Sequence, residues 1–426
     1  MITPAYSPTA TERVLPRMAL DFTTASLDSR VTITRALNTA TAIGSSGFIA
    51  VVNANLPRFD YNPVTLACKG LLIEESRANL ALNSSNLSAA SWSLLRATNT
   101  INSGTAPDNT NTANLLLDNA VSGTHVAIQL FTKAASPVVY AASIFLKAGV
   151  RTRGEFRMSD QAGNGTKVTF NLSNGTVGTP SVFGTGFTLG SASVVAMKDG
   201  WYRIILTTTS NSSVTLGLEL YIATDALAIS YVGNGSGFYV WGAQLEAGSF
   251  ATSYIPTTTT SLTRNADNAE MIGTNFSSWY NQTQGTFVTD FDKYSAASRG
   301  GVLCAGNTAG ATGTDIAIDG QNDAKVRAFI ENLGAVEMLN ATLATYAANT
   351  PIKGAIAYAT NNAVGAAASA LGTVDTSVVV PTLNALQIGA LRNSSSAAQS
   401  FLNGHIRSIR YYNIRLTNAE LQAFTQ

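Results

Sequence analysis

The residues Gly237–Thr257, GFYVWGAQLEAGSFATSYIPT, restrict the fold of this chain most strongly. The first half fits the two-residue period of a strand. This period places Tyr239, Trp241, Ala243 and Leu245 on one face. The chain then breaks at an alanine and a glycine and runs into a proline and a polar threonine tract. We therefore predict the closing strand of a β-domain, followed by an extended, solvated exit.

Short alternating segments recur throughout residues 92–254 and are separated by turns that contain glycine. In one of them, Leu216, Leu218, Leu220 and Ile222 occupy every second position. Asparagine followed by glycine at position 175 is a typical hairpin turn. Many short strands with little helical periodicity predict an antiparallel sandwich.

A second set of alternating segments fills residues 271–426 and ends in a helical pattern. In LTNAELQAF, Thr417 and Glu420 have the spacing of a capping box, and Leu416 and Leu421 have the spacing of a hydrophobic staple. No repeat of solenoid period is present, which argues against a β-helix. We predict an all-β chain whose last domain is closed by one short helix.

The N-terminal region differs from both sets. Pro4, Pro8 and Pro16 lie among serines and threonines and predict an extended arm that docks on another protein. The alternation from Met18 to Ala36 predicts a strand pair around a turn at Leu27–Ser29. The predicted division of the chain is a docking arm and β-connector over residues 1–82, a first sandwich over 83–256, a linker over 257–270 and a second sandwich over 271–426.

Composition and charge restrict the class of protein. Only 12% of the residues are charged, whereas 45% are apolar, which excludes disorder as the main state and is typical of β-rich viral fibres, spikes and adhesins. The net charge is +1, and no run of lysine and arginine is available to neutralise phosphates, so we expect no nucleic-acid partner. The sequence contains no segment of about 18 apolar residues, so we expect no membrane span. The N-terminus lacks the features of a signal peptide, so we expect synthesis in a host cytoplasm.

The sequence lacks the motifs of familiar catalytic chemistry. Gly233–Gly237 is the nearest run to a nucleophile elbow, but its serine is out of place. His125 and His405 are the only histidines and are too far apart in the sequence to suggest a metal site. Cys68 and Cys304 lie in apolar runs and are expected to be buried free thiols. We predict that the chain is not an enzyme and needs no cofactor.

Calcium is the one metal for which the sequence offers ligands. Asp290 and Asp292, or Asp315, Asp319 and Asp323, could supply the carboxylate oxygens that calcium prefers. Their spacing misses the calcium-loop pattern, and the glycine after Asp319 makes an ordinary hairpin turn the alternative. The candidate metal ligands are Asp290, Asp292 and Asp319.

Sugar binding requires exposed aromatic faces beside polar side chains, because sugar rings stack on such faces while their hydroxyls need polar partners. Trp201 and Trp241 lie within strand patterns and are expected to be core residues. Trp92 lies in a segment rich in serine and asparagine, and Trp279 and Tyr280 precede an asparagine and a glutamine. The candidate glycan-binding residues are Trp92, Trp279 and Tyr280, with a place in the core as the alternative for each.

Three sets of segments carry a resemblance to a known family. The first segments occur in this order: LPRFDYNPVT and CKGLLIEESR, then SIFLKAG, KDGWYRI and FYVWGAQLE, and finally GSFATSYIPT followed by TR and AD. Together they resemble a jelly-roll, carbohydrate-binding-like module of tailed-phage and prophage structural proteins. Between Gly285 and Phe424, QIGAL and FLNGHIRSIRYYNIRLTNAEL resemble the close of concanavalin-like or laminin-G-like sandwiches, which sometimes hold calcium near a rim.

The resemblance implies a virion structural protein, in the first place a tail fibre, spike or receptor-binding protein whose sandwiches contact bacterial surface polysaccharide. It implies a homotrimer on the symmetry axis of a fibre and docking on other virion proteins through the N-terminal arm. One alternative is a capsid or neck decoration protein, such as a head fibre, with no receptor role. A second is a glycan depolymerase, and a bacterial adhesin is disfavoured by the missing signal peptide.

Overall fold

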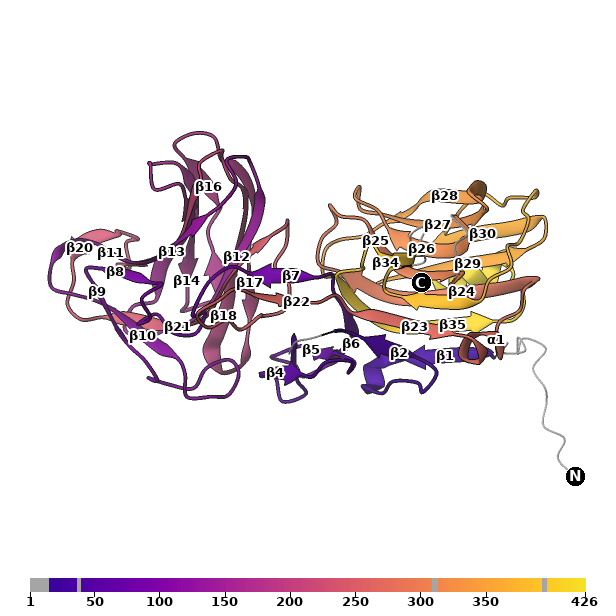
Figure 1. Cartoon of the computed structure of the whole chain (residues 1–426), viewed down its shortest axis with the longest axis horizontal. Coiled ribbons are helices and arrows are strands. Elements are labelled where there is room, and N and C mark those ends of the chain that lie inside the picture. The colour runs from indigo at the N-terminus through magenta and orange to yellow at the C-terminus, as the bar shows by residue number, and fades with distance from the viewer. Residues whose placement is uncertain (1–14, 37–39, 309–312, 393–396) are drawn as a thin grey trace, which may run out of the picture. The chain divides into compact units, whose positions relative to one another are not determined.

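The computed structural model describes residues 15–36, 40–308, 313–392 and 397–426, and the chain divides into two compact units. Unit 1 combines the described residues up to Thr34 with residues 69–75 and 267–426, and unit 2 contains residues 35–68 and 76–266. Both units are built from antiparallel sheets, so the predicted all-β fold is confirmed (Figure 1). The predicted four-part division is finer than these units and stays a prediction, and most of its docking arm, residues 1–14, lies outside the described residues.

Unit 2 is an antiparallel sandwich of two main sheets. Its elements are β3 (Ala40–Ile43), β4 (Ile49–Val52), β5 (Phe59–Tyr61), β7 (Arg77–Asn79), β8 (Ser93–Leu95), β9 (Ala97–Thr100), β10 (Asn114–Asp118), β11 (Ser122–Thr132), β12 (Val139–Lys147), β13 (Arg153–Ser159), β14 (Gly165–Asn171), β15 (Thr176–Val177), β16 (Ser181–Phe183), β17 (Thr188–Ala196), the 3-10 helix η2 (Lys198–Gly200), β18 (Trp201–Thr209), β19 (Thr215–Ala223), β20 (Ser230–Val232), β21 (Gly237–Ala247) and β22 (Leu262–Arg264).

The two main sheets of unit 2 enclose one apolar core. The six-stranded sheet has the order β17-β18-β12-β21-β10-β9, and the eight-stranded sheet has the order β15-β14-β13-β19-β11-β20, with β16 on β14 and β8 on β11. Ile144 and Leu206 of the first sheet and Phe156 and Leu220 of the second lie in the same cluster of buried residues. The predicted strand with leucines at every second position is therefore confirmed as β19, and its leucines face the core.

Strand β21 exists as predicted, but its side chains do not share one face. Gly242 has a left-handed backbone (φ 63°), which glycine adopts without strain, and the pairing register with β12 shifts at this point. Ala243 and Leu245 lie in the sandwich core, whereas Tyr239 and Trp241 pack in a separate cluster. The bulge therefore divides the predicted face in two. Trp241, and with it Trp201, is buried as expected.

The segment after β21 is packed, not solvated as the sequence suggested. Tyr254 and Ile255 are buried, and the backbone N–H of Ile255 donates to Gln244 Oε1 at 2.7 Å. The buried carboxylate of Glu246 accepts from the backbone N–H of Thr252 at 2.9 Å. Polar side chains of β21 thus satisfy the backbone of its own exit, which explains how an extended segment can be buried.

Unit 1 is a second antiparallel sandwich. Its elements are β1 (Met18–Asp21), the 3-10 helix η1 (Phe22–Thr24), β2 (Thr32–Thr34), β6 (Cys68–Ile73), β23 (Asn268–Ile272), α1 (Thr274–Ser277), β24 (Gln284–Lys293), β25 (Gly300–Gly306), β26 (Asp315–Gly320), β27 (Lys325–Asn332), β28 (Ala335–Thr345), β29 (Ile352–Ala359), β30 (Asn362–Ala367), β31 (Ala370–Leu371), β32 (Ala385–Ile388), β33 (Leu391–Arg392), β34 (Ala398–Gln399), β35 (Gly404–Tyr412) and α2 (Asn418–Phe424).

The two sheets of unit 1 are called the β24 sheet and the β26 sheet, each after one of its inner strands (Figure 1). The β24 sheet contains β31-β30-β29-β24-β35-β6, with β1 paired to β35, and the β26 sheet has the order β2-β23-β32-β25-β26-β27-β28. Phe287 and Ile356 of the first and Leu303 and Ile316 of the second are buried between them. The hairpin predicted over residues 18–36 is wrong, because β1 pairs with β35 and β2 pairs with β23, and each strand thereby joins a different sheet.

Helix α2 covers part of the outer face of the β24 sheet. Leu416 and Leu421 pack with apolar side chains of that face, among them Val288 and Tyr412. The predicted capping box is confirmed, because the Thr417 side chain accepts from the N–H of the helix residue three positions later and that residue's carboxylate accepts in return. In the described part of the chain, no helix has the length and apolar character needed to cross a membrane.

Candidate functional site

The predicted aromatic platforms are not exposed. Trp92 is 6% exposed and lies in the core cluster of unit 2, while Trp279 and Tyr280 are 4% and 8% exposed. The ring of Trp279 packs 5.0 Å from that of Tyr411, and the ring of Tyr280 packs 4.5 Å from that of Phe276. Every aromatic side chain among the described residues is buried or half-buried. The structure thus has the alternative given for each of them, a place in the core, because packing uses these ring faces.

Asp319, one of the three predicted metal ligands, is saturated by protein donors. Arg299 Nε donates to Oδ2 at 2.8 Å, and Arg327 Nη2 donates to the same oxygen at 2.6 Å. Gln321 Nε2 donates to Oδ1 at 2.7 Å. The Asp319 side chain is fully buried, so its negative charge is compensated by the two guanidinium groups.

Asp290 and Asp292 lie on β24, in the other sheet. Asp292 Oδ1 and His405 Nδ1 are 2.8 Å apart. Burial by itself would raise the pKa of Asp292, but the neighbouring His405 outweighs burial and holds that pKa below its ordinary value. Among the described residues, no three histidine, cysteine, aspartate or glutamate side chains are grouped so as to hold a metal ion. The structure therefore does not bring the predicted calcium ligands together.

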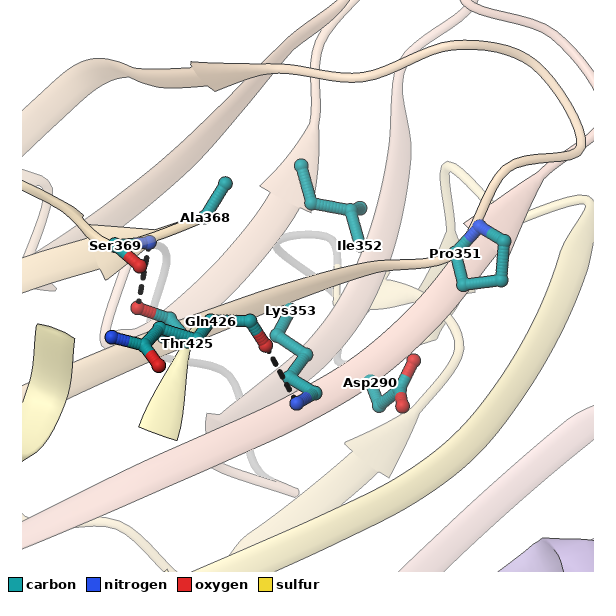
Figure 2. A pocket seen from close by; sticks show the side chains of 8 residues that line it. All are labelled: Asp290, Pro351, Ile352, Lys353, Ala368, Ser369, Thr425 and Gln426. Carbon is teal, nitrogen blue, oxygen red and sulfur yellow. Dashed lines mark hydrogen bonds between the residues drawn. The ribbon is translucent and has the colours of Figure 1, made fainter. Parts of the chain in front are cut away.

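Asp290 instead lies in a pocket of about 280 Å³ on the outer face of the β24 sheet (Figure 2). The pocket wall is formed by β24, the start of β29, the turn between β30 and β31, and the residues that follow α2. The residues that line it are Asp290, Pro351, Ile352, Lys353, Ala368, Ser369, Thr425 and Gln426.

The turn in the pocket wall has a strained backbone. Ala368 and Ser369 join β30 to β31 with φ values of 45° and 65°, which residues other than glycine and asparagine seldom adopt. Thr425 Oγ1 accepts from the N–H of Ser369 at 3.2 Å, and Gln422 Nε2 donates to the carbonyl of Ser369 at 3.2 Å. Helix α2 and the residue after it thus hold the turn in place. Strain of this kind is often found where a ligand is bound.

The Asp290 carboxyl group has unused hydrogen-bonding capacity. Its Oδ1 is buried without a hydrogen-bond partner, and the nearest cation, Arg407, has its Nε 4.0 Å from Oδ2. Burial raises the pKa of Asp290, against the opposing effect of Arg407 and Lys353. Lys353 Nζ donates to the main-chain oxygen of Gln426 at 2.6 Å, and an ammonium group has two further hydrogens to donate (Figure 2). Acceptor and donor groups therefore meet in one pocket.

A second unusual carboxyl group lies on the β26 sheet. Asp315 on β26 and Glu331 on β27 are directly opposite in the antiparallel register. Burial, and then the charge of Glu331, raise the pKa of Asp315 to about 7, and its Oδ1 is buried without a hydrogen-bond partner. Two carboxyl groups that face each other in this way can act as an acid and base pair. From the sequence, Asp315 was predicted only as a possible calcium ligand, because its pairing with Glu331 depends on strand register.

Comparisons with known proteins come from structure alone, since no family model and no curated protein matches the chain. The carbohydrate-binding module CBM40 of a Ruminococcus gnavus sialidase, bound to α2,3-sialyllactose, is 16% identical, with a TM-score of 0.31, over 34% of this chain and 84% of that one. The Trypanosoma rangeli sialidase in complex with sialic acid is 10% identical, with a TM-score of 0.28, over 74% of this chain and 60% of that one. At these values the likeness assigns neither an activity nor a ligand.

The prediction that the chain is not an enzyme is corrected at this point. The matched structures that extend over 74% of the chain are sialidases, which are glycoside hydrolases. The absence of familiar catalytic motifs was therefore too weak a basis for excluding an activity. The low TM-scores do not supply an activity in its place, so any catalytic role has to be argued from this chain's own carboxyl groups.

Proposed function

We propose that the chain is a structural protein of a virion and binds glycan on a bacterial surface through the pocket around Asp290. The Asp290 carboxyl group, whose Oδ1 has no hydrogen-bond partner, lies in one pocket with the Lys353 ammonium group, and this arrangement carries the proposal. Sugar hydroxyl groups need both acceptors and donors, and this pocket offers both. Its volume of about 280 Å³ is at the lower end for ligand pockets, which suits a single sugar residue of a longer chain.

The place in a virion is supported by the sequence resemblance and by composition. Low charge and two β-sandwich units are typical of fibres and spikes, and the segments named above resemble phage structural proteins. In this proposal the N-terminal arm docks on other virion proteins, the chain assembles as a homotrimer, and the protein is made in the host cytoplasm. Sedimentation of the purified chain tests the trimer, and a monomer at every concentration would contradict it.

Binding to polysaccharide from bacterial surfaces tests the pocket. Immobilised capsular polysaccharides should retain the wild-type protein, and Asp290→Ala should be retained much less. Asp323→Ala is the matched control, because Asp323 is an exposed carboxylate in a turn that accepts from the N–H of Lys325. Undiminished retention of Asp290→Ala, or no retention of the wild type on any polysaccharide, would refute the proposed site.

Labelling of intact particles separates a receptor-binding role from decoration. An antibody against the chain should mark the tail tip if the protein contacts the host. Labels confined to the head or collar would favour a capsid or neck decoration protein without a receptor role.

Cleavage of glycan is a second candidate function, and the Asp315–Glu331 pair favours it. Residues directly opposite in an antiparallel pair have Cβ atoms about 4.5 to 5.5 Å apart, so the side chains of Asp315 and Glu331 start close together on one face of the sheet. Glycoside hydrolysis generally uses such a pair of carboxyl groups. With a pKa of about 7, Asp315 holds a proton in a large share of the molecules at neutral pH and could serve as the acid, with Glu331 as its partner. Shortened products from a bound polysaccharide, lost in Asp315→Asn, would support cleavage, and intact polysaccharide after long incubation would dismiss it.

A further inference from the structure

The charges around the Asp290 pocket bear on which kind of glycan would bind there. Asp290 is directly opposite Lys353 of β29 on one side and Ser408 of β35 on the other. Arg407 is adjacent to Ser408, at the point where the register between β24 and β35 shifts. Arg410 lies two residues further along β35, opposite Val288. Three cationic side chains thus surround one carboxyl group on this face.

Among the described residues, none of the three cations donates a hydrogen bond to a carboxylate side chain. Lys353 donates to a main-chain oxygen, and Arg407 approaches Asp290 only to 4.0 Å, beyond hydrogen-bond distance. The Arg410 guanidinium lies 5.8 Å from the centre of the Phe424 ring. The Arg407 side chain is 30% exposed, so it can turn towards a ligand without breaking a short contact.

The other carboxyl groups near this face are engaged elsewhere. Asp292 is paired with His405, as described above. Asp21 on β1, opposite Ser408, accepts from the N–H of Thr23 at 2.9 Å and from its hydroxyl group at 2.6 Å. Around the pocket, the cationic side chains of Lys353, Arg407 and Arg410 therefore outnumber the carboxylate side chain of Asp290.

We propose that the pocket selects acidic sugar residues, with the ligand's carboxylate bound by Lys353 and Arg407 and a neighbouring hydroxyl group bound by Asp290. The proposal rests on the proposed glycan-binding function and narrows it to glycans that carry carboxylate groups. A guanidinium and an ammonium group suit a carboxylate because both donate charge-assisted hydrogen bonds. A neutral sugar would leave these donors without an anionic partner.

Carboxyl reduction of the same polysaccharide is the sharpest test, because it removes the negative charge and leaves the sugar linkages unchanged. A panel of acidic bacterial capsular polysaccharides is titrated into the full chain by calorimetry, each before and after reduction. We expect the acidic form to bind at least about tenfold more tightly than the reduced form. We also expect its affinity to fall between about 0.05 and 0.5 M salt, because salt screens exposed charges.

Two variants connect the preference to this pocket. Lys353→Met should remove most of the difference between acidic and reduced polysaccharide, and Arg407→Gln should reduce it independently if Lys353→Met folds poorly. Lys325→Met is the matched control, since Lys325 lies on β27 of the other sheet and contacts Thr345. It should bind like the wild type.

The outcomes separate this inference from the function on which it rests. Equal binding of acidic and reduced forms would overturn the preference for acidic sugars and leave glycan binding intact. A preference that survives both Lys353→Met and Arg407→Gln would overturn the assignment to this pocket. Failure to bind any polysaccharide would refute the proposed function together with the inference.

Discussion

Two carboxyl groups of unit 1, one on each sheet, lie close to basic side chains. Only one of the two has hydrogen bonds to both of its oxygens. Asp319 on the β26 sheet accepts from Arg299 and Arg327 at 2.8 and 2.6 Å and is fully buried. Asp290 on the β24 sheet has its nearest cation, Arg407, at 4.0 Å, and one of its oxygens has no partner. The sequence gives no hint of this difference, since both were predicted to bind the same metal.

The difference separates a structural charge from one that is available to a ligand. The Asp319 network compensates a buried charge, and nothing further can bind to it without breaking short hydrogen bonds. The Asp290 side has a pocket, free donor capacity on Lys353 and a strained turn in its wall. We therefore expect substitutions on the β26 side to change stability and those on the β24 side to change binding.

The largest effect is expected for Asp319→Ala. This change leaves two guanidinium groups uncompensated, one of them largely buried, and should lower the free energy of unfolding by about 3 kcal/mol. Asp290→Ala should change it by less than about 1 kcal/mol, because no close ion pair is lost. Urea unfolding of both variants measures the contrast, and equal losses would remove the distinction between the two carboxyl groups.

Asp315 should make the β26 side sensitive to pH. Its pKa is raised to about 7 in the folded chain, above the value of about 3.9 expected in the unfolded chain. At this group the folded state then binds more protons between these values, so the contribution of Asp315 to stability is largest below pH 4 and is lost as the pH rises towards 7.

Asp315→Asn should remove this slope and raise stability at pH 8 by more than about 1 kcal/mol, since one pKa unit corresponds to about 1.4 kcal/mol. Thermal unfolding of the wild type and the variant between pH 4.5 and 8 measures the effect. Parallel pH profiles for the two proteins would show that Asp315 is ionised in the folded chain.

A smaller effect is expected at the cap of α2. Thr417→Ala removes the side chain that accepts from the helix N-terminus and should cost about 1 kcal/mol. Because residues of and after α2 hold the turn at Ser369, hydrogen exchange should increase in residues 418–426 and 368–371, but not around Asp319. Uniform destabilisation of unit 1 would contradict this local role.

The smallest effect is expected in the strained turn. Ala368→Gly relieves a φ of 45° and should raise the free energy of unfolding by no more than about 1 kcal/mol, since glycine also gains entropy in the unfolded chain. If the strained turn shapes the pocket, the same change should weaken polysaccharide binding. A variant that is less stable than the wild type would show that the turn is not strained.

Local patterns in the sequence were sufficient for much of the fold. The alternation in residues 216–222 predicted strand β19, and the spacing of Thr417 and Glu420 predicted the capped helix. Among the described residues, neither cysteine forms a disulfide, as expected, although Cys68 is half-buried and not buried. The strand and the capped helix depend on residues that are close together in the sequence, so a single sequence is enough to predict them.

Features that depend on distant partners could not be predicted. The strands at Met18 and Thr32 alternate like a hairpin but pair with β35 and β23. The two-residue period alone predicts one continuous face on β21, but the bulge at Gly242 divides its side chains between two clusters. Trp92 and Trp279 have polar sequence neighbours but lie in cores, because burial is decided by what packs across from a side chain.

The candidate site also depends on residues that are distant in the sequence and could not be predicted as a whole. Of its lining residues, only Asp290 was singled out from the sequence, and it was assigned to a metal. Lys353, Ser369 and Thr425 reach the pocket from three other segments, so no local spacing could connect them. The pairing of Asp315 with Glu331 likewise depends on the register of two strands.

Hydrogen exchange of the full chain with and without an acidic polysaccharide tests glycan binding at the Asp290 pocket most directly. The account predicts slower amide exchange in residues 352–353 and 368–371, with unchanged exchange around Asp319 and Arg327. Protection confined to other segments of either unit, with no change in the pocket wall, would contradict it.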